Sequence, residues 1–116
     1  MEIKVKRVYE APEKSDGFRV LVDRLWPRGL SKEKAALGLW FKEIAPSSEL
    51  RKTFHQNGDF AAFVKLYHEE LKNNQNIVDD FIREIKKEPV VSFLYASHDS
   101  EHNQAKVLRE FILKTI

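Results

Sequence analysis

Three stretches of the chain have the hydrophobic pattern of β-strands. Over residues 2–9, apolar residues alternate with lysines, which is typical of a strand with one buried face. Residues 18–24 begin with a second run of β-formers, which follows an Asp-Gly turn signal. Residues 90–96 follow a proline and are apolar on both faces, as expected for a central strand of a parallel sheet. The pattern therefore predicts three strands.

Elsewhere the apolar residues recur at intervals of three and four positions, the spacing of amphipathic helices. One such helix is predicted to start at Ser31 and to include the apolar residues from 37 to 44, with Gly38 as its weak point. Further helices are expected to begin near residues 47, 59, 76 and 100, each after a Ser, Asp or Asn that can cap its first turn.

The order of these elements predicts one α/β domain over residues 1–116, with a small, mostly parallel three-stranded sheet flanked by about five helices. The connection between the first two strands is short for a parallel crossover, so a hairpin between them is an alternative.

Composition supports a folded domain and limits its function. The apolar content of 42% and the charged content of 33% are typical of globular proteins. A net charge of only +2 does not favour a nucleic-acid surface, because such surfaces carry a strong local excess of Lys and Arg. The absence of cysteine excludes thiol catalysis and disulfides. No apolar run is long enough to cross a bilayer and residues 1–15 are charged, so we expect a cytoplasmic protein.

Unusual residues gather where the second predicted strand ends. Arg24, Trp26 and Arg28 follow this strand in a turn that contains a proline and a glycine. Open α/β sheets bind ligands outside the carboxyl ends of their strands, so we expect these side chains to meet the loop after the third strand. Two guanidinium groups there suit a phosphate or carboxylate, with Trp26 as an apolar wall. The alternatives are an Arg24 paired with a neighbouring carboxylate, an exposed Arg28 and a Trp26 that packs in the core.

Four more residues complete the predicted binding site. Ser48 and Arg51 lie in the first turn of the helix that begins near residue 47, where a cation opposes the helix dipole unless it meets an anion. Tyr95 ends the third strand, and Asn103 is predicted one turn inside the last helix; both can hydrogen-bond a ligand. An exposed Arg51 without a ligand is the alternative.

His55 and Asp99 are the candidates for catalysis: imidazole is suited to proton transfer near neutral pH, and the Asp99 carboxylate can orient a ligand. A solvated His55, and an Asp99 that only caps the last helix, are the alternatives. His98 and His102 have the i, i+4 spacing of some metal sites, but no third ligand is evident. We therefore expect no metal ion, and nothing in the sequence indicates a cofactor.

Residues 23–29, Asp-Arg-Leu-Trp-Pro-Arg-Gly, resemble the YeaO-like branch of a bacterial family named domain of unknown function 488. The resemblance extends over almost the whole chain and implies a compact α/β fold and a cytoplasmic bacterial protein, with no established activity. His98 departs from the pattern, which has a lysine at this position. The other matching residues are Arg7, Val8, Tyr9, Pro12, Asp16, Gly17, Ala45, Pro46, Ser47, Leu50, Arg51, His55, Tyr67, Glu70, Leu71, Leu94, Tyr95, Ala96, Asp99, His102, Asn103 and Ala105.

Two functional hypotheses follow. In the first, a small phosphate- or carboxylate-bearing ligand binds in an arginine-lined cleft at the strand ends, and acid–base catalysis is left open. In the second, a non-enzymatic module contacts a protein or nucleic-acid partner through Trp26 and the basic residues. A purely structural role, in which Asp23, Arg24 and Glu70 form a buried ion-pair network, is a third alternative. The sequence leaves the oligomeric state open.

Overall fold

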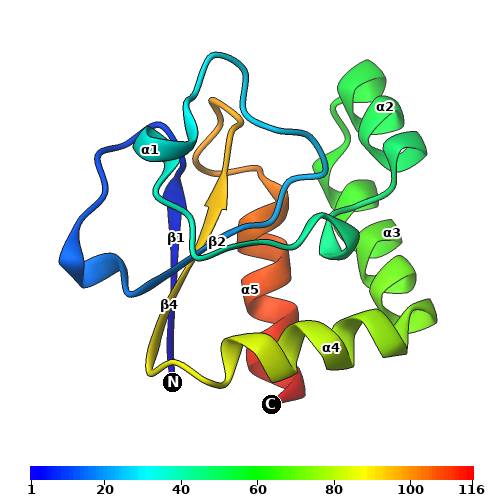
Figure 1. Cartoon of the computed structure of the whole chain (residues 1–116). Helices are drawn as coiled ribbons and strands as arrows, with labels where there is room; N and C mark the ends of the chain where they lie inside the picture. The colour runs from blue at the N-terminus through cyan, green and yellow to red at the C-terminus, as the bar shows by residue number, and fades with distance from the viewer.

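A four-stranded parallel sheet forms the centre of the structure (Figure 1). This computed structural model describes the whole chain, residues 1–116. The strands are β1 (Glu2–Arg7), β2 (Phe18–Leu21), β3 (Leu39–Trp40) and β4 (Val90–Tyr95), in the order β1-β4-β2-β3. The parallel sheet is thus confirmed, with four strands instead of three. Because β4 lies between β1 and β2 and is parallel to both, those two strands do not form a hairpin.

β4 is the central strand that its apolar sequence predicted. Its residues from Val91 to Tyr95 are at most 4% exposed. Ser92 is the polar exception, and its hydroxyl donates a hydrogen bond to the Asp16 carbonyl at 2.7 Å, so no buried polar group is left without a partner there. β1 ends at Arg7, two residues earlier than predicted.

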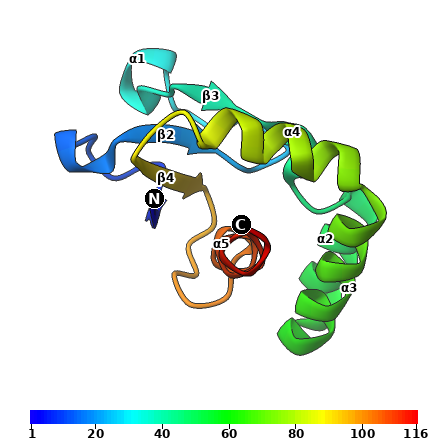
Figure 2. The same ribbon diagram turned by 90° about the horizontal axis from the view of Figure 1, so that it is seen from below.

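Helices cover one face of the sheet, and short turns cover the other (Figure 2). On the helical face, α4 (Gln75–Ile85) and α5 (Gln104–Thr115) lie next to the strands, and α2 (Ser48–Asn57) and α3 (Phe60–Asn73) lie farther out. The opposite face carries α1 (Lys32–Ala35) and a 3₁₀ turn over Lys14–Asp16. Five α-helices were expected and five are present, although α1 has only four residues.

The first predicted helix is the main error of the sequence analysis. α1 ends at Ala35, and the chain then runs extended as β3 and closes with a 3₁₀ turn over Lys42–Ile44. Gly38 explains the difference, because a Cβ at this position would lie 2.4 Å from the Phe18 ring. Its N–H donates to the Arg19 carbonyl at 2.8 Å, so the chain lies directly against β2. The apolar residues at helical spacing therefore belong to an edge strand and a turn.

The last helix begins four residues later than predicted, because Asn103 is its N-cap. The Asn103 side-chain oxygen accepts from the Lys106 N–H at 3.1 Å, and its amide donates to the Asp99 carbonyl at 3.0 Å. Asn103 thus precedes the helix instead of lying one turn inside it. Asp99 does not cap α5 either, since its carboxylate accepts from two N–H groups of the preceding turn.

The larger apolar core lies between the sheet and the helices. Phe81 of α4 packs edge-on against Phe93 of β4, with ring centroids 5.3 Å apart. Tyr67 of α3 is 1% exposed, and its hydroxyl donates to the Ile44 carbonyl at 2.6 Å, which confirms the predicted core position. No helix of the structure has the length and apolar character that crossing a membrane requires.

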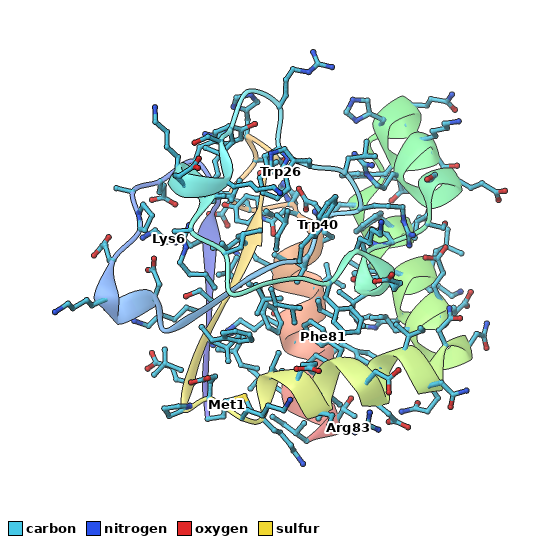
Figure 3. The ribbon with its side chains drawn as sticks, in the orientation of Figure 1. Met1, Lys6, Trp26, Trp40, Phe81 and Arg83 are labelled. Atoms are coloured by element: carbon cyan, nitrogen blue, oxygen red, sulfur yellow. The ribbon has the colours of Figure 1, made fainter.

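A second, smaller core lies on the opposite face, where Trp26 packs edge-on against Trp40 with ring centroids 5.4 Å apart (Figure 3). The Trp26 indole N–H donates to the Leu30 carbonyl at 2.7 Å, and both rings cover buried Leu21 and Leu94. Trp26 therefore has the core-packing role that was the alternative to a pocket wall.

Candidate functional site

A cleft of about 570 Å³ opens at the carboxyl ends of β2 and β4. The turn after β2, the loop after β4, the start of α5 and one side of α2 form most of its wall, and Phe63 of α3 contributes to it. Figure 1 shows both loops at the upper end of the sheet, with α2 beside them. The loops meet there because β2 and β4 are paired in parallel, as the sequence analysis expected.

Asp23 is a partly buried acidic residue in the wall of this cleft. Its Oδ2 accepts from the Ala96 N–H at 2.9 Å, and its Oδ1 accepts from the Gln104 side-chain amide. Burial raises the pKa of Asp23 to about 6, against the lowering effects of the Ala96 N–H and the Arg51 charge. No ion pair neutralises this carboxylate. A carboxyl group with a raised pKa inside a cleft is a frequent feature of functional sites.

The cations of the cleft come from α2. Arg51, Lys52 and His55 line it and are exposed. None of them takes part in any ion pair of the structure. His55 lies in the last turn of α2, which extends to Asn57, and not in the predicted loop. The cleft therefore contains two positively charged side chains that form no ion pair with a carboxylate of the protein.

The start of α2 is fixed by contacts with α3. Ser47 is the N-cap of α2, and its hydroxyl accepts from the Leu50 N–H at 3.1 Å. The Glu70 carboxylate accepts from the Ser47 hydroxyl at 2.5 Å and from its N–H at 2.9 Å. Glu70 thus anchors a helix and forms no ion pair with Arg24, so the proposed buried network of Asp23, Arg24 and Glu70 is absent. Ser48, the first residue of α2, lines the cleft.

Two histidines of the loop after β4, His98 and His102, also line the cleft. The His98 ring nitrogen Nδ1 is 3.2 Å from a guanidinium nitrogen of Arg7. His102 Nδ1 is 3.1 Å from the Asp99 carboxylate, and its ring packs edge-on against Phe60. Hydrogen bonds from backbone N–H groups and from His102 hold the pKa of Asp99 below its usual value. Asp99 itself does not line the cleft. No group of three or more acidic or histidine residues is arranged to hold a metal ion.

The three predicted arginines do not share one cleft, which corrects the central expectation for the site. Arg24 donates to the carbonyls of Ala45 at 2.9 Å and Pro46 at 3.2 Å, and it lines a separate cavity of about 400 Å³. Arg28 is exposed in the turn after β2, and its carbonyl accepts from the Tyr9 hydroxyl. Of the three guanidinium groups, the cleft at the strand ends contains that of Arg51.

The remaining candidates are divided in the same way. Asn103 lines the cleft as well as capping α5. Tyr95 is 4% exposed and belongs to the larger core, where burial raises the pKa of its hydroxyl, and it does not line the cleft. Sequence reasoning did not select Asp23, Lys52 and Gln104. Asp23 could have been selected as an acid at a strand end, whereas Gln104 carried no signal.

Comparison with known proteins gives the family. Residues 2–116 match the family model described as the inactive DUF488-N3 subclade. The chain belongs to this family. It is similar to uncharacterized protein YeaO of Escherichia coli K12, with 44% identity over 113 residues and 97% of each chain covered. It is also similar to uncharacterized protein Rv3073c of Mycobacterium tuberculosis H37Rv, with 36% identity over 111 residues, 95% of this chain and 92% of the relative. No solved structure matches. The YeaO-like resemblance is therefore confirmed.

Proposed function

We propose that this YeaO-like chain binds a small phosphate- or carboxylate-bearing ligand in the cleft at the ends of β2 and β4. The observation that carries the proposal is the pair Arg51 and Lys52, whose charged groups line the cleft without any ion-pair partner. Guanidinium and ammonium groups bind phosphate and carboxylate by charge-assisted hydrogen bonds. Such groups gathered in one concave site outside strand ends are typical of ligand sites in α/β proteins.

The proposal is binding without turnover. His55 and Asp99, the two candidate catalytic residues, are not placed as a pair, since His55 lies on α2 and Asp99 bonds His102. The word "inactive" in the description of the family model also supports a binding role. The alternative of a partner surface built on Trp26 has less support, because the Trp26 ring packs against Trp40 and its N–H is bonded within its own turn.

A thermal-shift series with phosphate, pyrophosphate, citrate and chloride tests the proposal. A ligand at ten times its Kd stabilises a protein by about 1.4 kcal/mol. This raises the melting temperature of a domain of this size by roughly 3–6 °C. We expect such a rise with at least one multivalent anion and none with chloride at equal ionic strength.

The matched pair of variants is Arg51→Gln and Arg83→Gln. Arg83 is an exposed arginine of α4 at the end of the molecule opposite Trp26 (Figure 3). Removing one charge-assisted contact weakens anion binding by roughly tenfold to a hundredfold, so Arg51→Gln reduces the shift to about a third or less and Arg83→Gln keeps it. Equal shifts in both variants would contradict binding in the cleft.

A further inference from the structure

An anion held by Arg51 and Lys52 leaves the apolar part of the cleft unoccupied. Phe54 of α2 and Phe63 of α3 line that part, with ring centroids 4.9 Å apart and ring planes inclined by 37°. Leu25, which is 64% exposed, lines it from the turn after β2. Aromatic and aliphatic walls of this kind favour a flat apolar group over a fully hydrated ion.

Asp23 adds an acceptor to the same cleft. A carboxylate has about four lone-pair positions, and the Ala96 N–H and the Gln104 amide occupy two of them. The remaining positions can accept N–H donors from a ligand. No Lys or Arg lies within ion-pair distance of Asp23, so this acceptor capacity is not used by the protein. Because an anion is repelled by Asp23, the acidic end of the ligand belongs at Arg51 and Lys52, and its N–H donors belong at Asp23.

We propose that the ligand is a nucleoside monophosphate, that is, a phosphate ester with a planar ring that carries N–H donors. The ring lies against Phe54 and Leu25, its N–H edge faces Asp23, and the phosphate meets Arg51 and Lys52. The volume of about 570 Å³ lies within the range of small-molecule pockets. This inference rests on the proposed anion site and adds the class of ligand.

Isothermal titration calorimetry with four probes tests the inference: AMP, GMP, ribose 5-phosphate and inorganic phosphate. Stacking of a base on an aromatic side chain gives a large gain in affinity. We therefore expect at least one of the two nucleotides to bind ten or more times more tightly than ribose 5-phosphate. Arg51→Gln lowers the affinity of every probe, and Arg83→Gln changes none.

Two further variants separate the ring from the phosphate. Asp23→Asn keeps the shape of the side chain but replaces part of its acceptor capacity with a donor. Phe54→Leu keeps an apolar side chain but removes an aromatic ring. In both variants we expect most of the nucleotide's advantage over ribose 5-phosphate to disappear, with circular dichroism confirming that each variant is folded.

The outcomes distinguish this inference from the proposed function. If ribose 5-phosphate and the nucleotides bind equally and Arg51→Gln weakens both, the nucleotide class is wrong and the anion site stands. If the advantage of the nucleotide survives both Asp23→Asn and Phe54→Leu, the assigned position of the ring is wrong. If no phosphate-bearing probe binds, the nucleotide class is wrong, and the anion site stands only if citrate still gives a thermal shift that Arg51→Gln reduces. If Arg51→Gln has no effect on the binding of any anion, both proposals are wrong.

Discussion

The two acids that flank β2 have opposite surroundings. Asp16, just before the strand, is 4% exposed and bonds Arg19 at 2.6 Å and Lys6 at 3.0 Å. Burial alone would raise the pKa of Asp16. The Glu13 N–H and the two cations lower it by more than burial raises it, so the pKa of Asp16 lies below its usual value. Asp23, just after the strand, has no ion pair, and burial raises its pKa to about 6.

The difference separates structural charge from charge that is available to a ligand. Around Asp16, all the charges are matched inside the protein, since the Arg19 guanidinium also donates to the Ala35 carbonyl at 2.8 Å. Around Asp23, the protein leaves a carboxylate and the cations Arg51 and Lys52 in one cleft without joining them. Removing one partner from a matched, buried network destabilises a fold, whereas an unmatched set of charges in a cleft is characteristic of a site.

Breaking the matched network has the largest expected effect. Asp16→Asn leaves the buried Arg19 charge without its partner, which destabilises the fold by about 3–5 kcal/mol. The measurement is urea unfolding. The control is Asp80→Asn, which breaks a pair with Arg83 whose side chains are 55% and 68% exposed and which loses under about 1 kcal/mol. A loss below about 1 kcal/mol for Asp16→Asn would show that its network does not stabilise the fold.

Asp23, the acid without an ion pair, contributes to stability with the opposite dependence on pH. Because the pKa of Asp23 is raised from 3.8 to about 6, the folded state holds a proton that the unfolded state releases. The stability that this group contributes is therefore present below about pH 4 and is lost as the pH rises through 6.

Asp23→Asn removes this dependence on pH. One pKa unit corresponds to 1.36 kcal/mol, so the stability of the variant relative to the wild type rises by up to about 3 kcal/mol between pH 4 and pH 8. The measurement is the difference between the unfolding free energies of the two proteins at each pH. A difference that is the same at pH 4 and at pH 8 would contradict the description of Asp23.

A smaller effect is expected from the same comparison between two arginines, Arg24 and Arg51. Arg24 donates to two backbone carbonyls, and Arg51 has no such contacts. Arg24→Met therefore destabilises the fold by about 1–2 kcal/mol, while the affinity for phosphate stays within about twofold of the wild type. Arg51→Gln does the reverse. If Arg24→Met instead weakens phosphate binding tenfold at full stability, the two arginines have been assigned the wrong roles.

The position of the cleft was predictable, because it depends on strands whose patterns are plain. The apolar run of β4 identified a central strand, and parallel pairing then brought the loops after β2 and β4 together. The N-terminal end of α2 was also predictable from its Ser cap. The strand pattern and the Ser cap are local, and the meeting of the two loops follows from the order of the strands, so a single sequence is enough to predict them.

The partners of the side chains were not predictable. Arg24 bonds backbone carbonyls, which every residue has and no sequence pattern distinguishes. Lys52 enters the cleft only because of where α2 lies, and its own sequence context is an ordinary exposed helix position. Gly38 was noted as a weak point in a helix, but its close contact with Phe18, which makes β3 a strand, depends on tertiary structure.

The central claim is that the ligand binds where charged side chains lack ion-pair partners. Its most direct test is a two-dimensional NMR titration of the wild-type protein with phosphate. The account predicts that the largest shifts fall on backbone amides of residues that line the cleft, namely Ser48, Arg51, Lys52, Phe54 and His55 of α2 and Ala96, Ser97, His98, His102, Asn103 and Gln104 after β4. It also predicts that the amides around Asp16 and Arg24 stay unchanged. The largest shifts around Arg24 or Arg28, or saturable binding that leaves residues 48–55 unaffected, would contradict it.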